Sequence, residues 1–187
     1  MPTMDVASKP KVTRDNETAI GVRMIDGVPF LKIEDVDGMP TFLMSVVSNS
    51  DHWMFIASNG GVTAGRKNAQ YALFPYYTDD KLIDLADITG SKTIFQVHTA
   101  DGLEIWEPFS DRFMGHYEIS THLYKSAYGN QLIFEEVNHD LQLAFQYKWS
   151  SSDEFGFVKT SGLKNLGETD RRVHVLDGIQ NIMPFGV

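Results

Sequence analysis

With 187 residues, 42% of them hydrophobic, the chain is long enough for one domain with a substantial core and short for two. Its net charge of -9 argues against a surface for nucleic acid or anionic membranes, because both need clustered lysines and arginines; it suits neutral ligands such as sugars. The lack of cysteine excludes disulfides and thiolate chemistry.

The chain begins with a polar segment, MPTMDVASKPKVTRDNET, which lacks the apolar core of a signal peptide. No apolar run in the chain is long enough to cross a bilayer. We therefore expect residues 1–18 to form a flexible segment, residues 19–187 to form one domain, and the protein to be cytoplasmic.

Three Asp-Gly pairs separate extended apolar runs in the chain. Asp26-Gly27 lies between AIGVRMI and VPFLKIEDV, Asp37-Gly38 lies between that run and MPTFLMSVV, and Asp101-Gly102 lies between TIFQVHTA and LEIWEPF. Asp-Gly between extended runs favours turns with positive φ, which fold two strands back on each other. Each pair therefore predicts a hairpin.

A strictly alternating pattern appears in LQLAFQYKW at residues 141–149, where every second residue is large and apolar. This is the period of a half-buried strand. Further strands are expected in HYEISTHLYK, QLIFEEV, FGFVKTSGL and RRVHVLDGI, and only KLIDLADI has a helical pattern. About ten strands with short connections predict an all-β fold, a large antiparallel β-sandwich.

The stretch SNGGVTAGRKNAQYALFPYYTDD, from Ser58 to Asp80, has some features of a phosphate-binding loop. Gly60 and Gly65 have the spacing of that motif, but Lys67 stands where the magnesium-binding hydroxyl belongs. Pro75 follows after a short run, so no helix is expected to supply amides to a phosphate. The pattern favours a glycine-rich connection between strands.

Candidate chemical groups are sparse. Glu135 and Glu136 are neighbours in an expected strand, so their side chains point to opposite faces and do not form a glycosidase pair. His116 and His122 are six residues apart on the expected strand HYEISTHLYK, too far to share a metal ion. Trp149 belongs to the alternating apolar face and is expected in the core, whereas Trp106, flanked by acids and Pro108, is the better surface candidate for stacking on a sugar.

The glycine-rich stretch resembles a block near the N-terminus of cellobiose and chitobiose phosphorylases and cyclic glucan synthases. Its matching residues are Gly60, Gly61, Thr63, Gly65, Asn68, Pro75, Tyr76, Asp79 and Asp80. The segment DGLEIWEPFSDR and the later FGFVKTSGLKNLGETDRRVHVLDGIQN resemble further segments of that family. The resemblance spans roughly residues 20–187 and is that of a diverged member.

The resemblance implies a β-super-sandwich of the galactose-mutarotase-like kind, placed ahead of a catalytic (α/α) barrel in a longer carbohydrate-active enzyme. It implies no catalytic residue, cofactor or metal in this chain, with inorganic phosphate serving as co-substrate of the parent enzyme elsewhere. Partners implied by the resemblance are the barrel, a carbohydrate and a second copy in a homodimer. The residues expected at the rim of the sugar site are Arg66, Asn68, Asp80, Trp106, Asp111 and His116.

Two alternatives remain beside this interpretation. The first is a free-standing carbohydrate-binding or aldose-epimerase-like sandwich, for which His116 and Glu118 are candidate residues. The second is a protein-docking sandwich with no ligand. The apolar end NIMPFGV suggests a sandwich that is incomplete at its C-terminal end and continues in a longer protein.

Overall fold

The computed structural model describes residues 18–74 and 79–183, and nearly all regular structure in them is antiparallel β. The predicted all-β sandwich is confirmed. Of the expected flexible segment 1–18, residues 1–17 lie outside the described part, as do residues 75–78 and 184–187.

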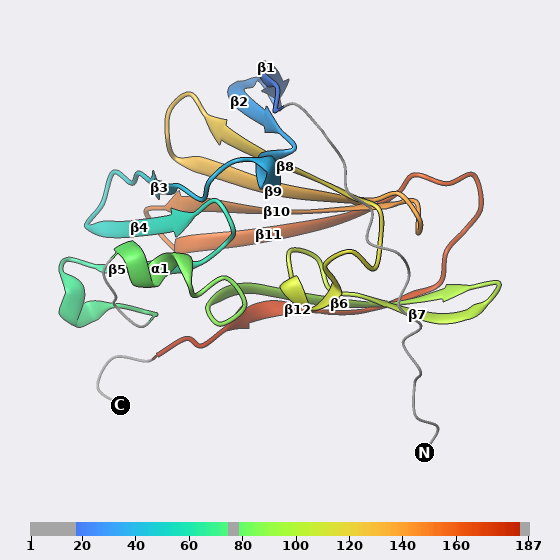
Figure 1. Cartoon of the computed structure of the whole chain (residues 1–187). Coiled ribbons are helices and arrows are strands. Elements are labelled where there is room, and N and C mark those ends of the chain that lie inside the picture. Colours follow the sequence, from blue (N-terminus) through green and yellow to red (C-terminus); the bar gives the residue numbers. More distant parts are fainter. Residues whose placement is uncertain (1–17, 75–78, 184–187) are drawn as a thin grey trace.

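One layer of the sandwich is a six-stranded sheet, the upper layer in Figure 1. Its strand order is β1-β2-β8-β9-β10-β11, so two hairpin-linked strands from the start of the chain pair with a later meander. The strands are β1 (Ile20–Ile25), β2 (Val28–Glu34), β8 (Ile119–Ser126), β9 (Gln131–Asn138), β10 (Leu143–Ser152) and β11 (Gly156–Asn165).

Two three-stranded sheets complete the structure, with orders β12-β6-β7 and β3-β4-β5. Figure 1 shows the first of them as the lower layer and the second at the left side of the molecule. Their strands are β3 (Leu43–Val46), β4 (His52–Ala57), β5 (Val62–Arg66), β6 (Gly90–Thr99), β7 (Gly102–Trp106) and β12 (Val173–Gln180).

Helical structure is limited to one short α-helix and three 3₁₀ turns. They are α1 (Asp79–Ile83), η1 (Val36–Gly38), η2 (Ala69–Tyr71) and η3 (Asp111–Phe113). The helix expected over KLIDLADI is thus confirmed only in its first residues, since the chain continues in turns after Ile83. Within the described residues, no helix has the length and apolarity needed to span a membrane.

Two of the three predicted hairpins form. Asp26 and Gly27 have φ of 49° and 78° and join β1 to β2, as the Asp-Gly pattern predicts. Thr99 pairs with Gly102 in the β6–β7 hairpin, which leaves a two-residue loop. The hairpin predicted at Asp37-Gly38 is wrong: these residues lie in η1, and β2 pairs with β8 instead of with the strand that follows it.

The core lies on the inner face of the six-stranded sheet. The alternation predicted for LQLAFQYKW is confirmed, because its five large apolar side chains are all buried while Gln142 and Gln146 are exposed. The buried set is Leu141, Leu143, Phe145, Tyr147 and Trp149. Aromatic rings interlock here, with Phe134 of β9 stacked on Tyr147 of β10 at 4.9 Å between centroids.

The glycine-rich stretch begins with a connection between β4 and β5 at residues 58–61, as predicted, whereas its residues 62–66 form β5 itself. Gly65 lies in β5, where a Cβ would stand 2.6 Å from the ring of Trp53 and 2.6 Å from the carbonyl of Tyr71. At Gly61 a Cβ would collide with the backbone carbonyl of Leu82. These glycines are therefore required by close packing, which accounts for the pattern without any phosphate.

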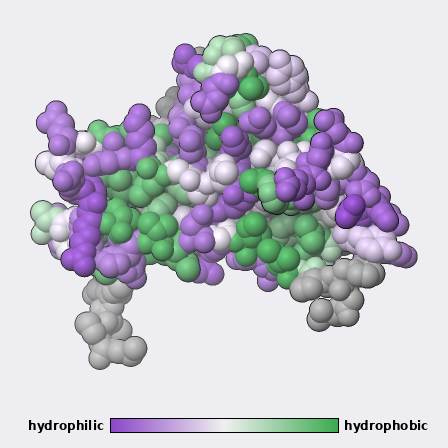
Figure 2. All heavy atoms as spheres, turned by 180° about the vertical axis from the view of Figure 1, so that it is seen from behind, coloured by the Kyte–Doolittle hydropathy of each residue, from purple (hydrophilic) through white to green (hydrophobic). Residues whose placement is uncertain are grey.

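One row across the six-stranded sheet runs from the core into water. Register aligns Trp149, Leu132, Lys125, Leu31 and Val22 on the same face. Trp149 and Leu132 are fully buried, whereas Leu31 is 46% and Val22 is 69% exposed. The apolar inner face thus extends past the region that the smaller sheets cover, and apolar areas among polar ones are also evident on the face seen in Figure 2.

The edge strands β11 and β12 belong to different layers and are joined by side chains. Lys159 on β11 donates to Asp177 on β12 at 2.6 Å, and Thr93 on β6 donates to the same carboxylate oxygen at 2.6 Å. Partial burial would raise the pKa of Asp177, but these hydrogen bonds and the charge of Lys159 hold it below its usual value. One ion pair therefore closes this side of the sandwich.

Candidate functional site

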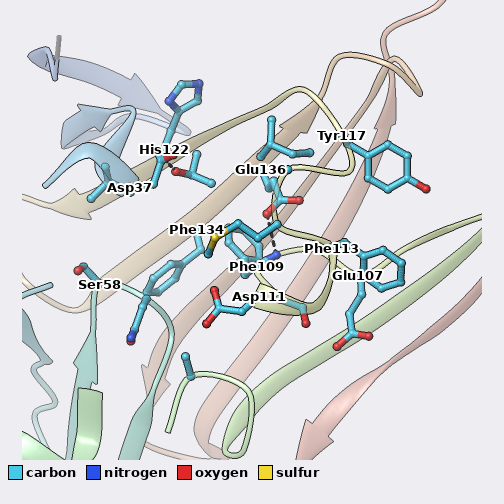
Figure 3. A pocket seen from close by; sticks show the side chains of 18 of the residues that line it. Asp37, Ser58, Glu107, Phe109, Asp111, Phe113, Tyr117, His122, Phe134 and Glu136 are labelled. Atoms are coloured by element: carbon cyan, nitrogen blue, oxygen red, sulfur yellow. Dashed lines mark hydrogen bonds between the residues drawn. The ribbon is translucent and has the colours of Figure 1, made fainter. Parts of the chain in front are cut away.

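A cavity of about 540 Å³ opens between the inner face of β8 and β9 and the segment that links β7 to β8. Figure 3 shows Glu136 and Phe134 of β9 on one side of it and the segment carrying Phe109, Asp111 and Phe113 on the other. Its lining combines aromatic rings with carboxylates. The aromatic residues are Trp106, Phe109, Phe113, Tyr117 and Phe134, and the acidic residues are Asp37, Glu107, Asp111, Glu118 and Glu136.

Glu136 is placed in the cavity by the alternation of β9. Leu132, Phe134 and Glu136 share the inner face, and Glu135 projects from the other face, where it accepts a hydrogen bond from Tyr124 at 2.6 Å. The prediction that Glu135 and Glu136 point to opposite faces is therefore confirmed. A carboxyl group consequently occupies a position that the strand pattern reserves for a core side chain.

The carboxylate of Glu136 is only 5% exposed and has a partner for each oxygen. Oε1 accepts the indole N–H of Trp106 at 2.7 Å, and Oε2 accepts the backbone N–H of Phe109 at 2.6 Å. Burial raises the pKa of Glu136 to about 7, although both hydrogen bonds act in the opposite direction. This group therefore changes its charge near neutral pH.

Phe109 holds an unusual backbone conformation, with φ of 62°. This left-handed region is unfavourable for a residue with a Cβ, and it is sustained here by the hydrogen bond to Glu136 and by ring packing. The Phe109 ring meets Tyr147 edge-to-face at 5.3 Å and Phe134 at 6.1 Å. The strained residue thus anchors the segment over the cavity.

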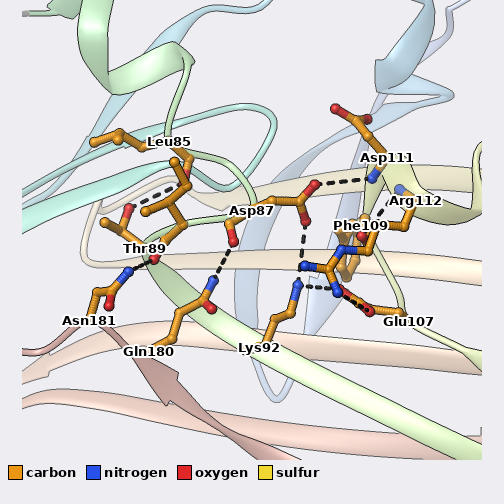
Figure 4. A network of polar contacts seen from close by, with 12 residues as sticks. Leu85, Asp87, Thr89, Lys92, Glu107, Phe109, Asp111, Arg112, Gln180 and Asn181 are labelled. Atoms are coloured by element: carbon orange, nitrogen blue, oxygen red, sulfur yellow. Dashed lines mark hydrogen bonds and ion pairs between the residues drawn. The ribbon is translucent and has the colours of Figure 1, made fainter.

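A polar network holds the same segment to the lower sheet (Figure 4). Lys92 of β6 forms ion pairs with Glu107 and, at 3.5 Å, with Asp87. The other carboxylate oxygen of Asp87 accepts the backbone N–H of Asp111 at 3.3 Å, and Arg112 lies 3.9 Å from Glu107. Lys92 and Arg112 therefore balance the charge of Glu107, whose carboxylate turns away from Glu136 in Figure 3.

The remaining polar groups of the lining are acidic or neutral. Asp37 accepts a hydrogen bond from Thr121 at 2.6 Å, and among the described lining residues none is Lys or Arg. His122 contributes to the lining, but its ring points away from Glu136 in Figure 3, and its Nδ1 accepts the N–H of Asp35 at 3.3 Å. Burial, with the nearby charge of Lys32, lowers the pKa of His122, so its ring is neutral at pH 7.

Two of the six predicted rim residues, Trp106 and Asp111, line the cavity. The placement of Trp106 at the surface is wrong, because the side chain is 1% exposed and its ring packs on Phe95 at 5.1 Å. Its N–H nevertheless reaches the site through Glu136. Trp149 is buried as predicted.

Of the other four predicted residues, the three whose side chains are described do not line the cavity. Arg66 is exposed and pairs with Asp51 at 2.8 Å, and Asn68 caps η2 by accepting the N–H of Gln70 at 3.0 Å. The side chain of Asp80 lies outside the described part of the chain. His116 precedes β8 instead of lying in it, which corrects the strand predicted from His116, and its ring contacts Tyr117 at 4.5 Å.

Glu136, Asp37, Phe109 and Tyr117 line the cavity but were not predicted as site residues. For Glu136 the pattern was present, since QLIFEEV places one glutamate in phase with Leu132 and Phe134. Phe109 and Tyr117 lie between β7 and β8 and Asp37 lies in η1, and no local pattern reveals the course of either segment. Across residues 18–74 and 79–183, no group of three or more His, Cys, Asp or Glu side chains is arranged to hold a metal ion.

Comparison with known protein families and with curated proteins gives no match for this chain.

Proposed function

We propose that this chain is a carbohydrate-binding β-sandwich that serves as the non-catalytic N-terminal part of a glycoside-phosphorylase-like enzyme acting on β-linked di- or oligosaccharides. In this role it packs on a downstream (α/α) barrel, contributes to a homodimer and presents the cavity to sugar. Inorganic phosphate is the co-substrate of the parent enzyme and binds outside this chain.

The observation that carries the proposal is the lining of the 540 Å³ cavity. This volume falls within the roughly 300–1,000 Å³ typical of small-molecule sites. An aromatic face such as that of Phe113 matches the apolar face of a sugar ring, and the carboxylates of Asp37 and Asp111 can accept hydrogen bonds from hydroxyl groups. A sugar presents both kinds of surface at once.

A binding role is favoured over bond cleavage by the state of Glu136. Glycoside cleavage needs two carboxyl groups that act across one bond. Both oxygens of Glu136 already accept hydrogen bonds, from Trp106 and from Phe109. These bonds hold the carboxyl group in place and favour a structural and positioning role.

Titration of the isotope-labelled chain with a panel of disaccharides, followed by NMR, tests the proposal. We expect the amide resonances of residues 107–118 to shift with saturation, and Phe113→Ala to weaken binding. Phe155→Ala is the matched control, because Phe155 is an exposed ring in the β10–β11 turn. The absence of any saturable shift across the panel would contradict the proposal.

A second assay addresses the non-catalytic part of the proposal. The purified chain is mixed with the same disaccharides and inorganic phosphate, and release of sugar 1-phosphate is followed. We expect none. Turnover by this chain alone would contradict the proposal, and hexose epimerisation abolished by substituting His116 or Glu118 would favour the aldose-epimerase-like alternative instead.

A further inference from the structure

Three carboxylates of the cavity have no cationic partner within the described part of the chain. Asp37 pairs with the neutral hydroxyl of Thr121, and no ion pair joins Asp111 or Glu136 to a Lys or Arg side chain. Glu107 differs, because Lys92 and Arg112 lie against it. Acidic groups without a cationic partner are therefore concentrated where a ligand would enter.

Glu136 is the decisive group in this arrangement. Its side chain is more than nine-tenths buried, points into the cavity in Figure 3, and has only neutral N–H partners. The charge of Asp37 acts on it, since that carboxylate contributes to the raised pKa of Glu136. A positive charge bound beside these two acids would stabilise the ionised form of the buried one.

The aromatic part of the lining also suits a cation. The half-buried ring of Phe113 is nearly parallel to that of Tyr117, with centroids 6.5 Å apart and planes 26° apart. Tyr117 is only 5% exposed, so Phe113 presents the accessible face. The faces of such rings attract an ammonium group, and the attraction grows as the group loses water. The aromatic rings and the carboxylates of the lining thus both favour an ammonium group.

We propose that the cavity selects an amino sugar with a protonated amine over neutral and acidic sugars. The inference rests on the proposed carbohydrate binding and names the class of sugar. The ammonium group lies among the carboxylates of Asp37, Asp111 and Glu136, and the apolar face of the ring lies against the aromatic side chains. Uronic acids and free phosphate are repelled by the same carboxylates.

Separate titrations with disaccharides of matched size test this selectivity. Calorimetric titrations of the full chain at pH 6 and low salt use four disaccharides: cellobiose, di-N-acetylchitobiose, its fully deacetylated form, and a disaccharide containing a uronic acid. We expect the deacetylated form to bind at least about tenfold more tightly than cellobiose, and we expect this ratio of affinities to fall as the salt concentration is raised. The acidic disaccharide should bind more weakly than cellobiose.

Two variants and a control locate the effect. Asp111→Asn should bring the ratio of the affinity for the amine to the affinity for cellobiose close to one, because the amide oxygen still accepts a hydrogen bond from a hydroxyl group but carries no charge. Asp111 is exposed, so the fold should tolerate the change. Asp37→Asn is a second test at another point of the lining. Asp153→Asn makes the same change in the exposed β10–β11 turn and should leave the preference intact.

An independent readout comes from Glu136 itself. A bound ammonium group favours the ionised form, so the NMR titration of its carboxyl carbon should shift to lower pH with the deacetylated disaccharide and not with cellobiose. Equal affinity for the amine and neutral disaccharides, or no shift in this titration, would overturn the amino-sugar inference and leave the proposed function intact. Failure of all four sugars to bind would overturn both.

Discussion

The indole N–H of Trp106 on β7 donates to the carboxylate of Glu136 on β9 at 2.7 Å, and this bond links the two layers of the sandwich. Both side chains are buried. A hydrogen bond to a buried carboxylate is stronger than one between neutral groups, and loss of one partner leaves the other poorly solvated. The candidate site and the stability of the fold therefore depend on the same contact.

Replacing Trp106 isolates the contribution of this bond. Trp106→Phe removes the donor and part of the ring, whereas Trp149→Phe makes the same change at an equally buried indole whose N–H has no partner among the described residues. We expect Trp106→Phe to lower the free energy of unfolding by about 1–3 kcal/mol more than Trp149→Phe does. Urea denaturation followed by circular dichroism provides the measurement, and equal losses would show that the bond is not stabilising.

Glu136 should make stability depend on pH in an uncommon direction. Its pKa in the folded state is about 7, above the value of 4.5 for an unperturbed glutamate, so the folded chain holds the proton more tightly than the unfolded chain. The free energy of unfolding contributed by this group therefore falls as pH rises from about 4.5 to about 7 and is constant above, a loss on the order of 3 kcal/mol.

Glu136→Gln removes the titration and keeps a side chain of similar shape. The free energy of unfolding of the wild type minus that of this variant should fall from pH 5 to pH 8, as measured by urea denaturation at each pH. Glu154→Gln makes the same substitution in an exposed turn and serves as the control. A difference that does not vary with pH would show that Glu136 is ionised throughout.

Phe109 offers a test of backbone strain. A φ of 62° is unfavourable for alanine but not for glycine, which has no Cβ. Phe109→Gly should therefore be about 1 kcal/mol more stable than Phe109→Ala, although both lose the ring. At Phe134, in the extended strand β9, the order should be reversed. Thermal unfolding of the four variants is the measurement, and the same order at both sites would argue against strain at Phe109.

The exposed part of the inner face should promote self-association. Val22 lies on the edge strand β1 in an apolar row, and such an edge invites pairing with another chain. Val22→Lys should reduce the apparent mass at high concentration in light scattering. Ala100→Lys adds the same charge in the exposed β6–β7 turn as a control. A wild-type chain that stays monomeric at high concentration would contradict the predicted association.

Strand positions were predictable because each depends on a short local pattern. The alternation of residues 141–149 identified the strand and its buried face, although β10 itself begins at Leu143, and Asp26-Gly27 identified a turn whose φ values match the expectation. The same dipeptide at residues 37–38 was misleading because the turn there begins at Asp35, with φ of 49°, and β2 has its second partner far along the chain. A dipeptide indicates a turn but not which strands it joins.

The cavity could be predicted only in part, because its residues come from segments far apart in the sequence. Trp106 was expected at the surface on the basis of its acidic neighbours, yet its burial is decided by Glu136, thirty positions away. Asp111 was included correctly, whereas Arg66 and Asn68 have local partners that engage their side chains. Local polarity does not reveal which polar groups meet across two sheets.

The ion pair between Lys159 and Asp177 also makes stability depend on pH, in the direction opposite to Glu136. Because the pKa of Asp177 is lowered in the folded chain, its contribution to stability is complete above the unfolded value and is lost as pH falls through the folded one. Glu136 gains a proton, and stability, over a higher range of pH. In mildly acidic solution Asp177 is ionised and Glu136 is protonated, so the sandwich should resist denaturation best below neutrality. Stronger acid should loosen the side held by Asp177, and alkaline conditions should weaken the interior around Glu136.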